Sequence, residues 1–523
     1  MIRFLALLAV LGLGASSAAA DRAPQATHVA VPPSHWTYTA LRQVLAEVDV
    51  PGLSPIRFMG DVVFNRSELA EAAWSACEAV RDGGDPGVHT VRWVGALVRE
   101  FAWELEARGR SPEDALAWLS ETGDTSYSTY GDAALGYVSR RGAPASIDLS
   151  WRFGVARFSE KPHTFALAEV GRQTADASRD RLAATGLRRL LLVSDKPDRK
   201  LSLGRGIYRT GVGIRGTYNI DSLAGPVDHI RYRGKIGFWG TEGVLDVAWW
   251  TDMNQGQRNY VLTKRLEMSL SPELEFSISD TARTRAVTSP FYLISPLSLW
   301  TSLLRDRVFG DTTVFEDDNV MNHAELYWVA SDALHLYADA AIDEVDLALV
   351  LDTVGVYRLV QSLLGWTGAF QSEPGQGASE NGILLGLYAP DLDGKRRLAG
   401  RLEAAWASPR LGITSRDPAL DYFRDGVPLQ HRLGPDARGL YGELRYLPPS
   451  DWLASAYVEL AERGLSLPST SREAIWGLSV SRQLGRNAAL RLNLTHRERW
   501  GAADARSSRQ SSTAASVSVH AWF

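Results

Sequence analysis

The chain ends in Ser516-Val517-Ser518-Val519-His520-Ala521-Trp522-Phe523, a run in which alternate residues are apolar. The same two-residue period recurs in 266–270 (LEMSL) and 274–278 (LEFSI), which are separated only by Ser271-Pro272-Glu273. A strand places successive side chains on opposite faces, so each run has one apolar and one polar face. Many such strands suit a closed cylinder with hydrocarbon outside and water inside, because every backbone amide within a bilayer needs a partner and a closed sheet has no edge.

The alternating segments continue upstream to about residue 130. They begin near residues 132, 146, 162, 187, 201, 228, 243, 261, 274, 323, 333, 381, 397, 439, 452, 474, 488 and 515. The sequence therefore predicts a mainly β protein, an antiparallel transmembrane β-barrel of about 18 strands over 126–523, with 16 strands as the alternative. The free terminal aromatic Phe523 resembles the last residue of bacterial outer-membrane barrels, and this resemblance implies the barrel assembly machinery as a partner.

The lengths of the connections provide a separate check. Short turns are expected at alternate connections: 195–199, 240–242, 271–273, 331–332, 447–451 and 484–487. Longer gaps, at 284–322, 343–380, 408–438 and 498–514, fall at other connections. Outer-membrane barrels keep periplasmic turns short and external loops long. A soluble β-sandwich or repeat array would also alternate, but it explains the turn pattern and the terminal aromatic less well.

The first 20 residues indicate a secretory signal. Arg3 precedes the apolar run Phe4–Leu13, and Ala18-Ala19-Ala20 supplies small residues at a cleavage site. An uncleaved anchor is the alternative, but the run is shorter than the roughly 20 apolar residues that a spanning helix needs. The single cysteine, Cys77, excludes a disulfide within the chain and a thiolate metal cluster.

Residues 21–125 are predicted to form an acidic, helical, periplasmic module. They carry 16 acidic and 9 basic residues, a net charge of −7, whereas residues 126–523 are nearly neutral. No basic stripe of the kind that binds nucleic acid is present. Apolar residues recur at helical spacing in 36–48 and again in 67–80.

This module resembles the S-layer-homology module of outer-membrane porins. The resemblance rests on Trp36 in the first helix, the Phe58-Met59-Gly60 loop and the Asn65-Arg66-Ser67-Glu68 opening of the second helix, in which Asn65 stands in place of the usual Thr as the helix cap. It implies a grip on peptidoglycan-linked polymer by Trp36, Arg66 and Glu68. The alternative is that Arg66 and Glu68 only cap the helix and form ion pairs at its start.

Charged residues that alternate with the apolar face are predicted to line the lumen. Arg231, Arg233 and Lys235 form a basic row on one strand, and Arg205 and Arg209 follow another apolar run. Such charges would cost roughly 2–4 kcal/mol against lipid at the midplane, so they need water or ionic partners. Two interpretations stay open: Arg–Glu pairs that rigidify the wall, or a contact path for an anionic solute or polysaccharide.

The stretch 201–218 (LSLGRGIYRTGVGIRGTY) breaks the alternation, since Leu203 and Arg205 share one parity. A β-bulge at one of its glycines is expected to restore the pattern. The stretch is not a nucleotide loop, because its glycines lack the dinucleotide spacing and no Lys-Ser/Thr follows.

The region from Thr284 to Val345 resembles the Wzi family of capsule-assembly proteins. The resemblance rests on Ser295-Pro296-Leu297, Asp318-Asn319 and Asp343-Glu344, with Ser295 replacing an Asn. It implies an outer-membrane lectin-like barrel, plugged or narrow, that holds capsular polysaccharide. Trp300, Asp317 and Asp318 are then further candidates for polysaccharide contact.

No motif of catalysis or cofactor binding is present: there is no HExxH, no GxSxG and no paired metal-ligand spacing. The sequence therefore predicts no enzyme, no cofactor and no metal. It predicts an outer-membrane protein, in contact with lipid, for attachment or assembly of surface polysaccharide. The alternative is a solute-conducting porin that links the outer membrane to peptidoglycan.

Overall fold

The computed structural model describes residues 28–59, 62–83, 86–120, 126–140, 143–159, 164–173, 184–196, 199–221, 225–238, 241–271, 273–285, 318–343, 380–395, 397–413, 418–424, 427–448, 451–467, 470–501 and 510–522. The predicted signal segment, Trp300, Asp317 and Phe523 lie outside these residues.

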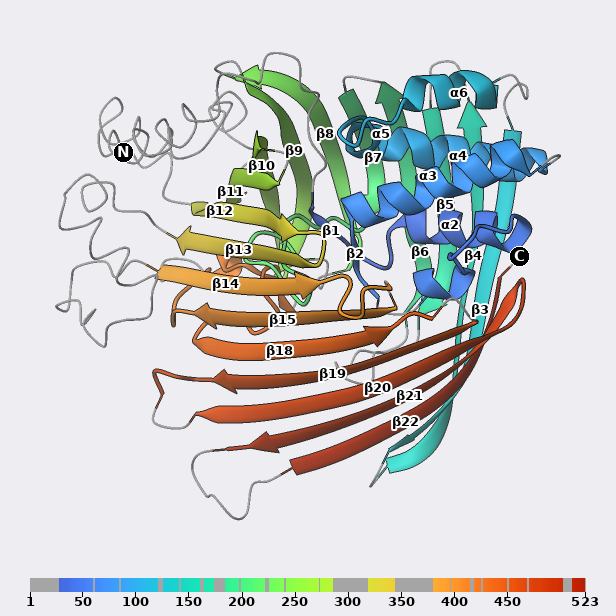
Figure 1. Ribbon diagram of the computed structural model, residues 1–523. Coiled ribbons are helices and arrows are strands. Elements are labelled where there is room, and N and C mark those ends of the chain that lie inside the picture. Colours follow the sequence, from blue (N-terminus) through green and yellow to red (C-terminus); the bar gives the residue numbers. More distant parts are fainter. Residues whose placement is uncertain are drawn as a thin grey trace.

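Eighteen antiparallel strands form one closed barrel, which confirms the predicted fold class and strand number (Figure 1). The first nine are β3 (Ser126–Arg140), β4 (Ala143–Ser159), β5 (Thr164–Gln173), β6 (Ala184–Lys196), β7 (Arg199–Gly206), β8 (Val227–Phe238), β9 (Thr241–Asn254), β10 (Gln257–Ser271) and β11 (Leu274–Thr284). The others are β12 (Asp318–Ser331), β13 (Leu334–Asp343), β14 (Glu380–Ala389), β15 (Leu398–Ala407), β18 (Ala437–Tyr446), β19 (Trp452–Arg463), β20 (Ser471–Gly485), β21 (Ala488–Trp500) and β22 (Gln510–Trp522).

The barrel closes where β22 pairs with β3. Val517 lies opposite Tyr137, and Val519 lies opposite Leu135. All four side chains are about half exposed and share the outer face. The quoted C-terminal stretch is therefore the strand that completes the cylinder.

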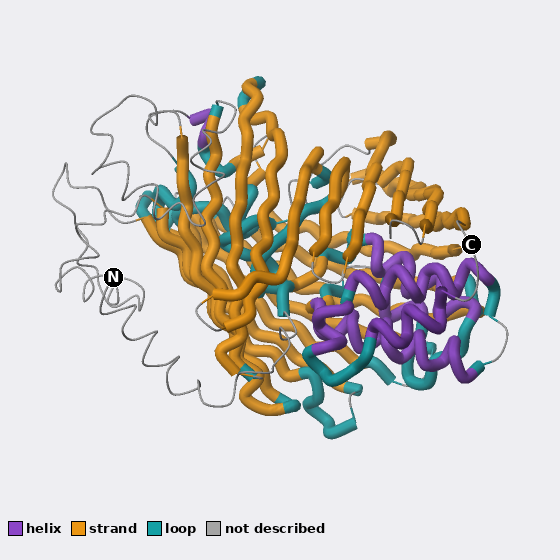
Figure 2. Tube along the Cα trace, turned by 90° about the horizontal axis from the view of Figure 1, so that it is seen from above, coloured by secondary structure: helices purple, strands orange, loops and turns teal. Residues whose placement is uncertain are grey.

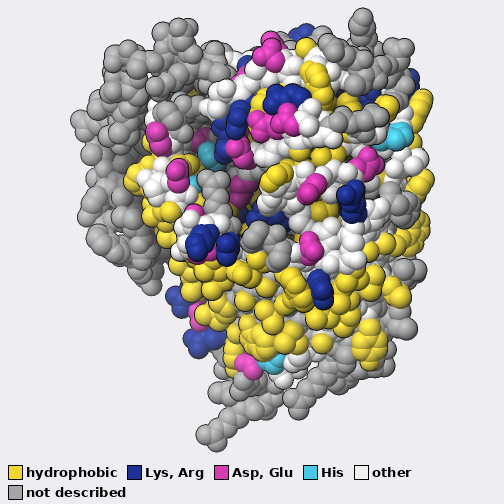
Figure 3. Space-filling view, turned by 45° about the vertical axis from the view of Figure 1, so that its right-hand side comes forward, with side chains coloured by type: hydrophobic (Ala, Val, Ile, Leu, Met, Phe, Trp, Pro, Cys, Tyr) yellow, Lys and Arg dark blue, Asp and Glu magenta, His cyan; other side chains and the backbone are white. Residues whose placement is uncertain are grey.

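The outer surface of the barrel is apolar. Leu440, Leu460, Leu478 and Leu492 lie on neighbouring strands, and each is more than 40% exposed. Figure 3 shows a broad apolar area over the lower part of the molecule, with charged side chains gathered above it. Large exposed leucines on adjacent strands are unfavourable in water and suit a lipid-facing wall.

The predicted short turns fall at alternate connections, although β3–β4 and β9–β10 are joined by equally short turns at the other end. The pairs β6–β7, β8–β9, β10–β11, β12–β13 and β20–β21 are joined by tight turns at one end of the barrel. The chain passes from the helices into β3 at this same end, and β22 also ends there (Figure 1). Following the sequence-based prediction, we refer to it as the periplasmic end and to the opposite one as the external end.

The α-helices of the described residues lie together at the periplasmic end of the strands (Figure 2). They are α2 (Trp36–Glu47), α3 (Arg66–Asp82), α4 (Val88–Glu100), α5 (Ala102–Glu106) and α6 (Pro112–Ser120), with the 3-10 turn η1 (Pro55–Phe58) and the short pair β1 (Ala30–Val31) and β2 (Phe64–Asn65). Helix α3 begins with the capping box expected from its sequence: Glu68 N–H donates to Asn65 Oδ1 and Asn65 N–H donates to Glu68 Oε2, each at 2.8 Å. Among the described residues, no helix is long and apolar enough to cross a bilayer.

Candidate functional site

The helices pack against the inner wall of the barrel. The Trp93 ring lies edge-on to Tyr130, Phe158 and Phe165, with ring centroids 5.0–6.0 Å apart, and Trp36 contacts Phe165 at 4.9 Å. These aromatic residues are buried. Contacts of this kind add to the free energy gained from burying the rings, so β3, β4 and β5 hold the module firmly. Trp36, a predicted wall-polymer contact, is buried inside this cluster.

A second contact reaches the strands on the other side of the β22–β3 seam. Ile56 and Met59, in and just after η1, share a buried cluster with Leu453, Ala489 and Trp522 of β19, β21 and β22. All five are at most 5% exposed. Since β22 pairs with β3, the module contacts one continuous arc of the wall from β19 to β5.

Arg66 is the centre of the module's charges. Its Nε donates to Glu104 Oε1 at 2.5 Å and its Nη1 to Glu100 Oε1 at 2.7 Å, while its guanidinium lies over the Phe101 ring. Burial alone would raise the pKa of Glu104, but the nearby cations Arg66 and Arg233 lower it to about 2. Arg66 is thus engaged within the protein, and wall binding by this residue stays a prediction.

Glu68 connects the module to the barrel. Its Oε1 accepts a hydrogen bond from the Tyr388 hydroxyl at 2.5 Å, and its Oε2 lies 3.7 Å from the guanidinium of Arg401. Arg401 and Arg445 both donate to the Val63 carbonyl, at 2.8 and 3.2 Å. Glu68, the capping-box partner of Asn65, therefore also docks α3 on β14 and β15.

The basic row predicted on β8 faces inward and bonds to acidic partners. Arg231 Nε donates to Asp246 at 2.9 Å, Arg233 Nη2 to Glu267 at 2.7 Å, and Lys235 Nζ to Glu106 of α5 at 2.7 Å. Arg233 also lies 3.6 Å from Glu104. These contacts agree with ion pairs that rigidify the wall, and here they also clamp the helices.

The predicted bulge in 201–218 is wrong. Strand β7 ends at Gly206, and residues 207–221 leave the wall and run through the lumen. Their backbone amides are satisfied by wall carboxylates, since Ile214 and Arg215 donate to Glu403 at 2.5 and 2.9 Å and Tyr218 donates to Asp339 at 2.7 Å. Alternation fails here because the segment is not a strand.

Two candidate residues from this stretch have different surroundings. Arg209 is buried in the lumen and bonds to carbonyls within its own segment, including that of Ile214 at 3.2 Å. The prediction that Arg205 lines the lumen is wrong. Arg205 shares the outer face with Leu201 and Leu203 and pairs with Asp228 at 3.1 Å. Arg205 is still part of β7, so its side chain points outward like those of the residues two and four positions before it.

A second external connection also enters the lumen. Residues 408–436 include η5 (Pro418–Leu420), β16 (Phe423–Arg424) and β17 (Val427–Pro428). The Tyr422 hydroxyl donates to the Thr281 and Asn319 carbonyls at 2.5 and 3.1 Å, which fixes the segment across β11 and β12. Asp221 N–H donates to the Leu429 carbonyl at 2.7 Å, so the two inserted segments support each other.

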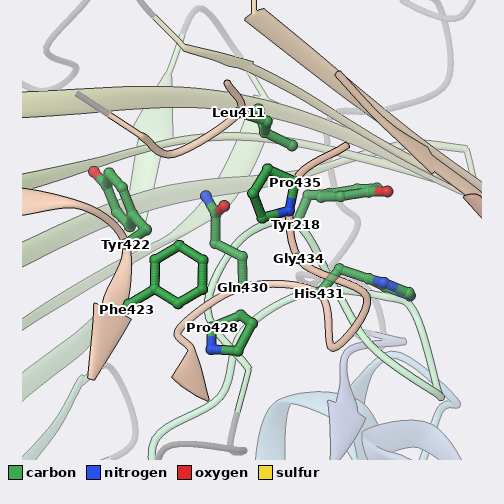
Figure 4. Close-up of a pocket in the computed structure, with 9 residues that line it drawn as sticks. All are labelled: Tyr218, Leu411, Tyr422, Phe423, Pro428, Gln430, His431, Gly434 and Pro435. Atoms are coloured by element: carbon green, nitrogen blue, oxygen red, sulfur yellow. The ribbon is translucent and has the colours of Figure 1, made fainter. Parts of the chain in front are cut away.

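A small pocket lies between these two segments near the external ends of the strands (Figure 4). Its enclosed volume is about 10 Å³, so the pocket is a shallow depression rather than a deep cavity. It is lined by Tyr218, Leu411, Tyr422, Phe423, Pro428, Gln430, His431, Gly434 and Pro435. Aromatic faces beside an amide and an imidazole form a surface that offers both stacking and hydrogen bonds, as a sugar ring requires.

His431 is neutral near pH 7. Burial, together with the charge of Arg432, lowers its pKa to about 3. Its Nδ1 accepts a hydrogen bond from Leu433 N–H at 3.3 Å, which assigns the ring proton to Nε2. The Cδ2–Nε2 edge of the ring packs against Gly216 of the first inserted segment.

The inner wall differs between its two sides. Over β10–β13, inward-facing residues such as Arg265, Ser277, Glu325 and Asp339 are at most 2% exposed. Over β19–β22, several inward-facing residues are partly exposed, among them Arg491, Asn493, Ser516 and Ser518. We call these the filled wall (β10–β13) and the accessible wall (β19–β22).

The structure says little about the remaining candidates for polysaccharide contact. Asp318 is the first residue of β12, in register with Thr284, while Trp300 and Asp317 lie outside the described residues. Within the described part of the chain, no group of three or more His, Cys, Asp or Glu side chains is arranged to hold a metal ion. Sequence reasoning missed the pocket, whose only sequence signal is the Tyr, Phe, Gln and His content of 422–431.

The fold is shared with outer-membrane barrels of known structure. Wzi of Escherichia coli, an outer-membrane protein involved in group 1 capsule assembly and described as a carbohydrate-binding β-barrel, matches with a TM-score of 0.51 at 12% identity, over 94% of this chain and 99% of its own. OccAB4 of Acinetobacter baumannii matches with a TM-score of 0.45 at 7% identity, over 76% of this chain and 98% of its own. No protein-family model matches the sequence, and no curated protein matches it either.

Proposed function

We propose that this protein is a closed barrel of the bacterial outer membrane that binds surface polysaccharide and serves in its attachment or assembly. The observation that carries this proposal is the lumen: a helical module lies across one mouth and two external segments fill the other, with an aromatic pocket between them. A conducting pore would need water-lined space from end to end. The Wzi match supports the fold, and the binding of carbohydrate is carried over from it as part of the proposal.

The function proposed is binding rather than catalysis. The polar groups of the pocket come from an amide, a neutral imidazole and two tyrosine hydroxyls that are already bonded to backbone carbonyls. This set offers hydrogen bonds and ring stacking. Nothing in it pairs a nucleophile with a general base.

The test combines conductance with binding. The full-length protein, reconstituted in planar bilayers, should show no large steady conductance, and in detergent it should retain extracted capsular polysaccharide on a filter or column. Phe423→Ala and Gln430→Ala should weaken that retention. Leu467→Ala, in the exposed turn between β19 and β20, is the matched control and should not. A large steady conductance with no retention would contradict the proposal.

One observation favours the alternative of a solute-conducting porin. The accessible wall offers inward polar side chains to solvent, as a solute path would. Its periplasmic end is covered by Ile56, Met59 and Trp522, which are buried together. We therefore place the porin second, and the conductance measurement separates the two.

A further inference from the structure

Three arginines converge on one carboxylate at the external end of the accessible wall. Glu473 lies 3.1 Å from Arg463 Nη1, 2.8 Å from Arg497 Nε and 2.7 Å from Arg499 Nε. The Glu473 side chain is only 2% exposed. These residues come from the external ends of β19, β20 and β21, and alternation places them on the inner face.

The charges of this cluster do not balance. One carboxylate faces three guanidinium groups, which leaves a net charge of about +2 by formal count. In the filled wall the charges are better balanced, since Arg265 pairs with the two carboxylates Glu267 and Glu325, and Glu267 also pairs with Arg233. Like charges held close together repel unless an anion lies between them.

The surplus charge is accessible. The Arg499 side chain is 53% exposed and that of Arg463 is 33% exposed. Among the described residues, Arg499 bonds only through Nε, which leaves both of its Nη atoms to solvent or a ligand. A guanidinium with two free N–H groups on one edge matches the two oxygens of a carboxylate.

The cluster is continuous with the aromatic pocket. Arg463 Nε donates to the Leu433 carbonyl at 3.3 Å, and Leu433 N–H donates to His431 Nδ1. His431 and Gly434, on either side of this link, line the pocket (Figure 4). Arg432, in the same segment, pairs with Glu459 of β19 at 3.0 Å.

We propose that the pocket and the arginine cluster form one site for an acidic sugar. Arg463 and Arg499 bind the anionic group, a carboxylate or a phosphate, and the sugar ring lies against the rim of the pocket at Phe423. This inference rests on the proposed polysaccharide function and adds the chemical class of the polymer.

The experiment compares three polymers on the full-length protein in detergent: polygalacturonate, a phosphorylated mannan and neutral dextran. Binding is followed by calorimetry at 50 and 300 mM salt. The wild type should bind an acidic polymer at least about tenfold more tightly than dextran, and higher salt should weaken that binding. Preference between the two acidic polymers identifies the anion.

The variants are Arg463→Gln/Arg499→Gln and, as matched control, Arg438→Gln. Arg438 is 62% exposed and paired with Glu462 on the outer face of the neighbouring strand β18. The double variant should lose the preference for the acidic polymer, and the control should keep it. A shift in gel migration on heating, the same in all variants, shows that the barrel has folded.

Equal binding of acidic and neutral polymer by the wild type overturns this inference and leaves polysaccharide binding intact. So does unchanged acidic binding by the folded double variant. Failure of the wild type to bind any polymer overturns the proposed function together with the inference.

Discussion

The filled wall and the accessible wall carry the same residue types with different consequences. Arg265 on β10 and Arg491 on β21 are both inward-facing arginines. Arg265 is fully buried and pairs with Glu267 and Glu325, whereas Arg491 is partly exposed and bonds to neutral side chains at 2.9–3.1 Å. What covers a lumen charge, more than its identity, decides whether it serves stability or can meet a ligand.

The largest effect is expected from Arg265→Gln. The substitution leaves Glu325 buried without its cation and Glu267 with Arg233 alone, which should cost about 3–5 kcal/mol of the free energy of unfolding. Urea titration of the refolded protein in lipid vesicles measures this loss. A change below about 1 kcal/mol would mean that water reaches the filled wall.

The helical module should weaken in mild acid. Burial lowers the pKa of His35 to about 3, against 6.5 for the free side chain, so the folded module disfavours the charged ring. Stability is then complete above pH 6.5 and falls as the pH drops, by about 2 kcal/mol at pH 5. Hydrogen exchange of α2 amides at pH 7 and 5 measures the loss.

His35→Asn is the control for that measurement, because asparagine does not titrate. The variant should show a flatter profile between pH 6.5 and 5. Below that window, protonation of Glu104, whose pKa the Arg66 guanidinium lowers against the effect of burial, should destabilise both proteins alike. Equal slopes for the two proteins above pH 5 would contradict the assignment to His35.

Gly386→Ala tests the packing at the edge of the filled wall, where β14 pairs with β13. A Cβ at Gly386 would lie 2.0 Å from the Tyr337 ring on the neighbouring strand, so the ring would have to move. It would then lose the 2.7 Å hydrogen bond from its hydroxyl to Glu403. We expect a loss of about 1–3 kcal/mol in the same urea titration. Gly442→Ala, where the nearest atom lies at 3.6 Å, should cost less.

Cysteine labelling compares the two walls directly. In a Cys77→Ala background, Ser516→Cys on the accessible wall should react with a membrane-impermeant maleimide on the order of ten times faster than Ser277→Cys on the filled wall, since Ser277 is 2% exposed. Mass spectrometry of timed samples gives both rates. Equal rates would remove the distinction between the walls.

The smallest effect is expected from Arg491→Gln. Its side chain is partly solvated and makes hydrogen bonds to Ser479 and Asn493, which water can replace. We expect a change of about 0.5–1 kcal/mol in the free energy of unfolding. A loss as large as that of Arg265→Gln would show that the accessible wall is buried in the assembled protein.

Much of the barrel followed from local pattern. The period of two in 516–521 and in the hairpin around Pro272, with the alternation of short and long connections, predicted 18 strands and the end at which the chain finishes. These features depend on neighbours in sequence and on the contrast between lipid and water. Asn65 could likewise be identified as a helix cap, because its partner Glu68 is three residues away.

The sequence by itself thus determined the cylinder, its strand number and which faces are apolar. Only the tertiary structure decided that Arg66 pairs with Glu100 and Glu104, that 207–221 leaves the wall for the lumen, and that Arg463, Arg497 and Arg499 meet at Glu473. Those contacts join residues that are distant along the chain or that come from different strands. No local period records them, because they depend on how the inserted segments share the space inside the closed sheet.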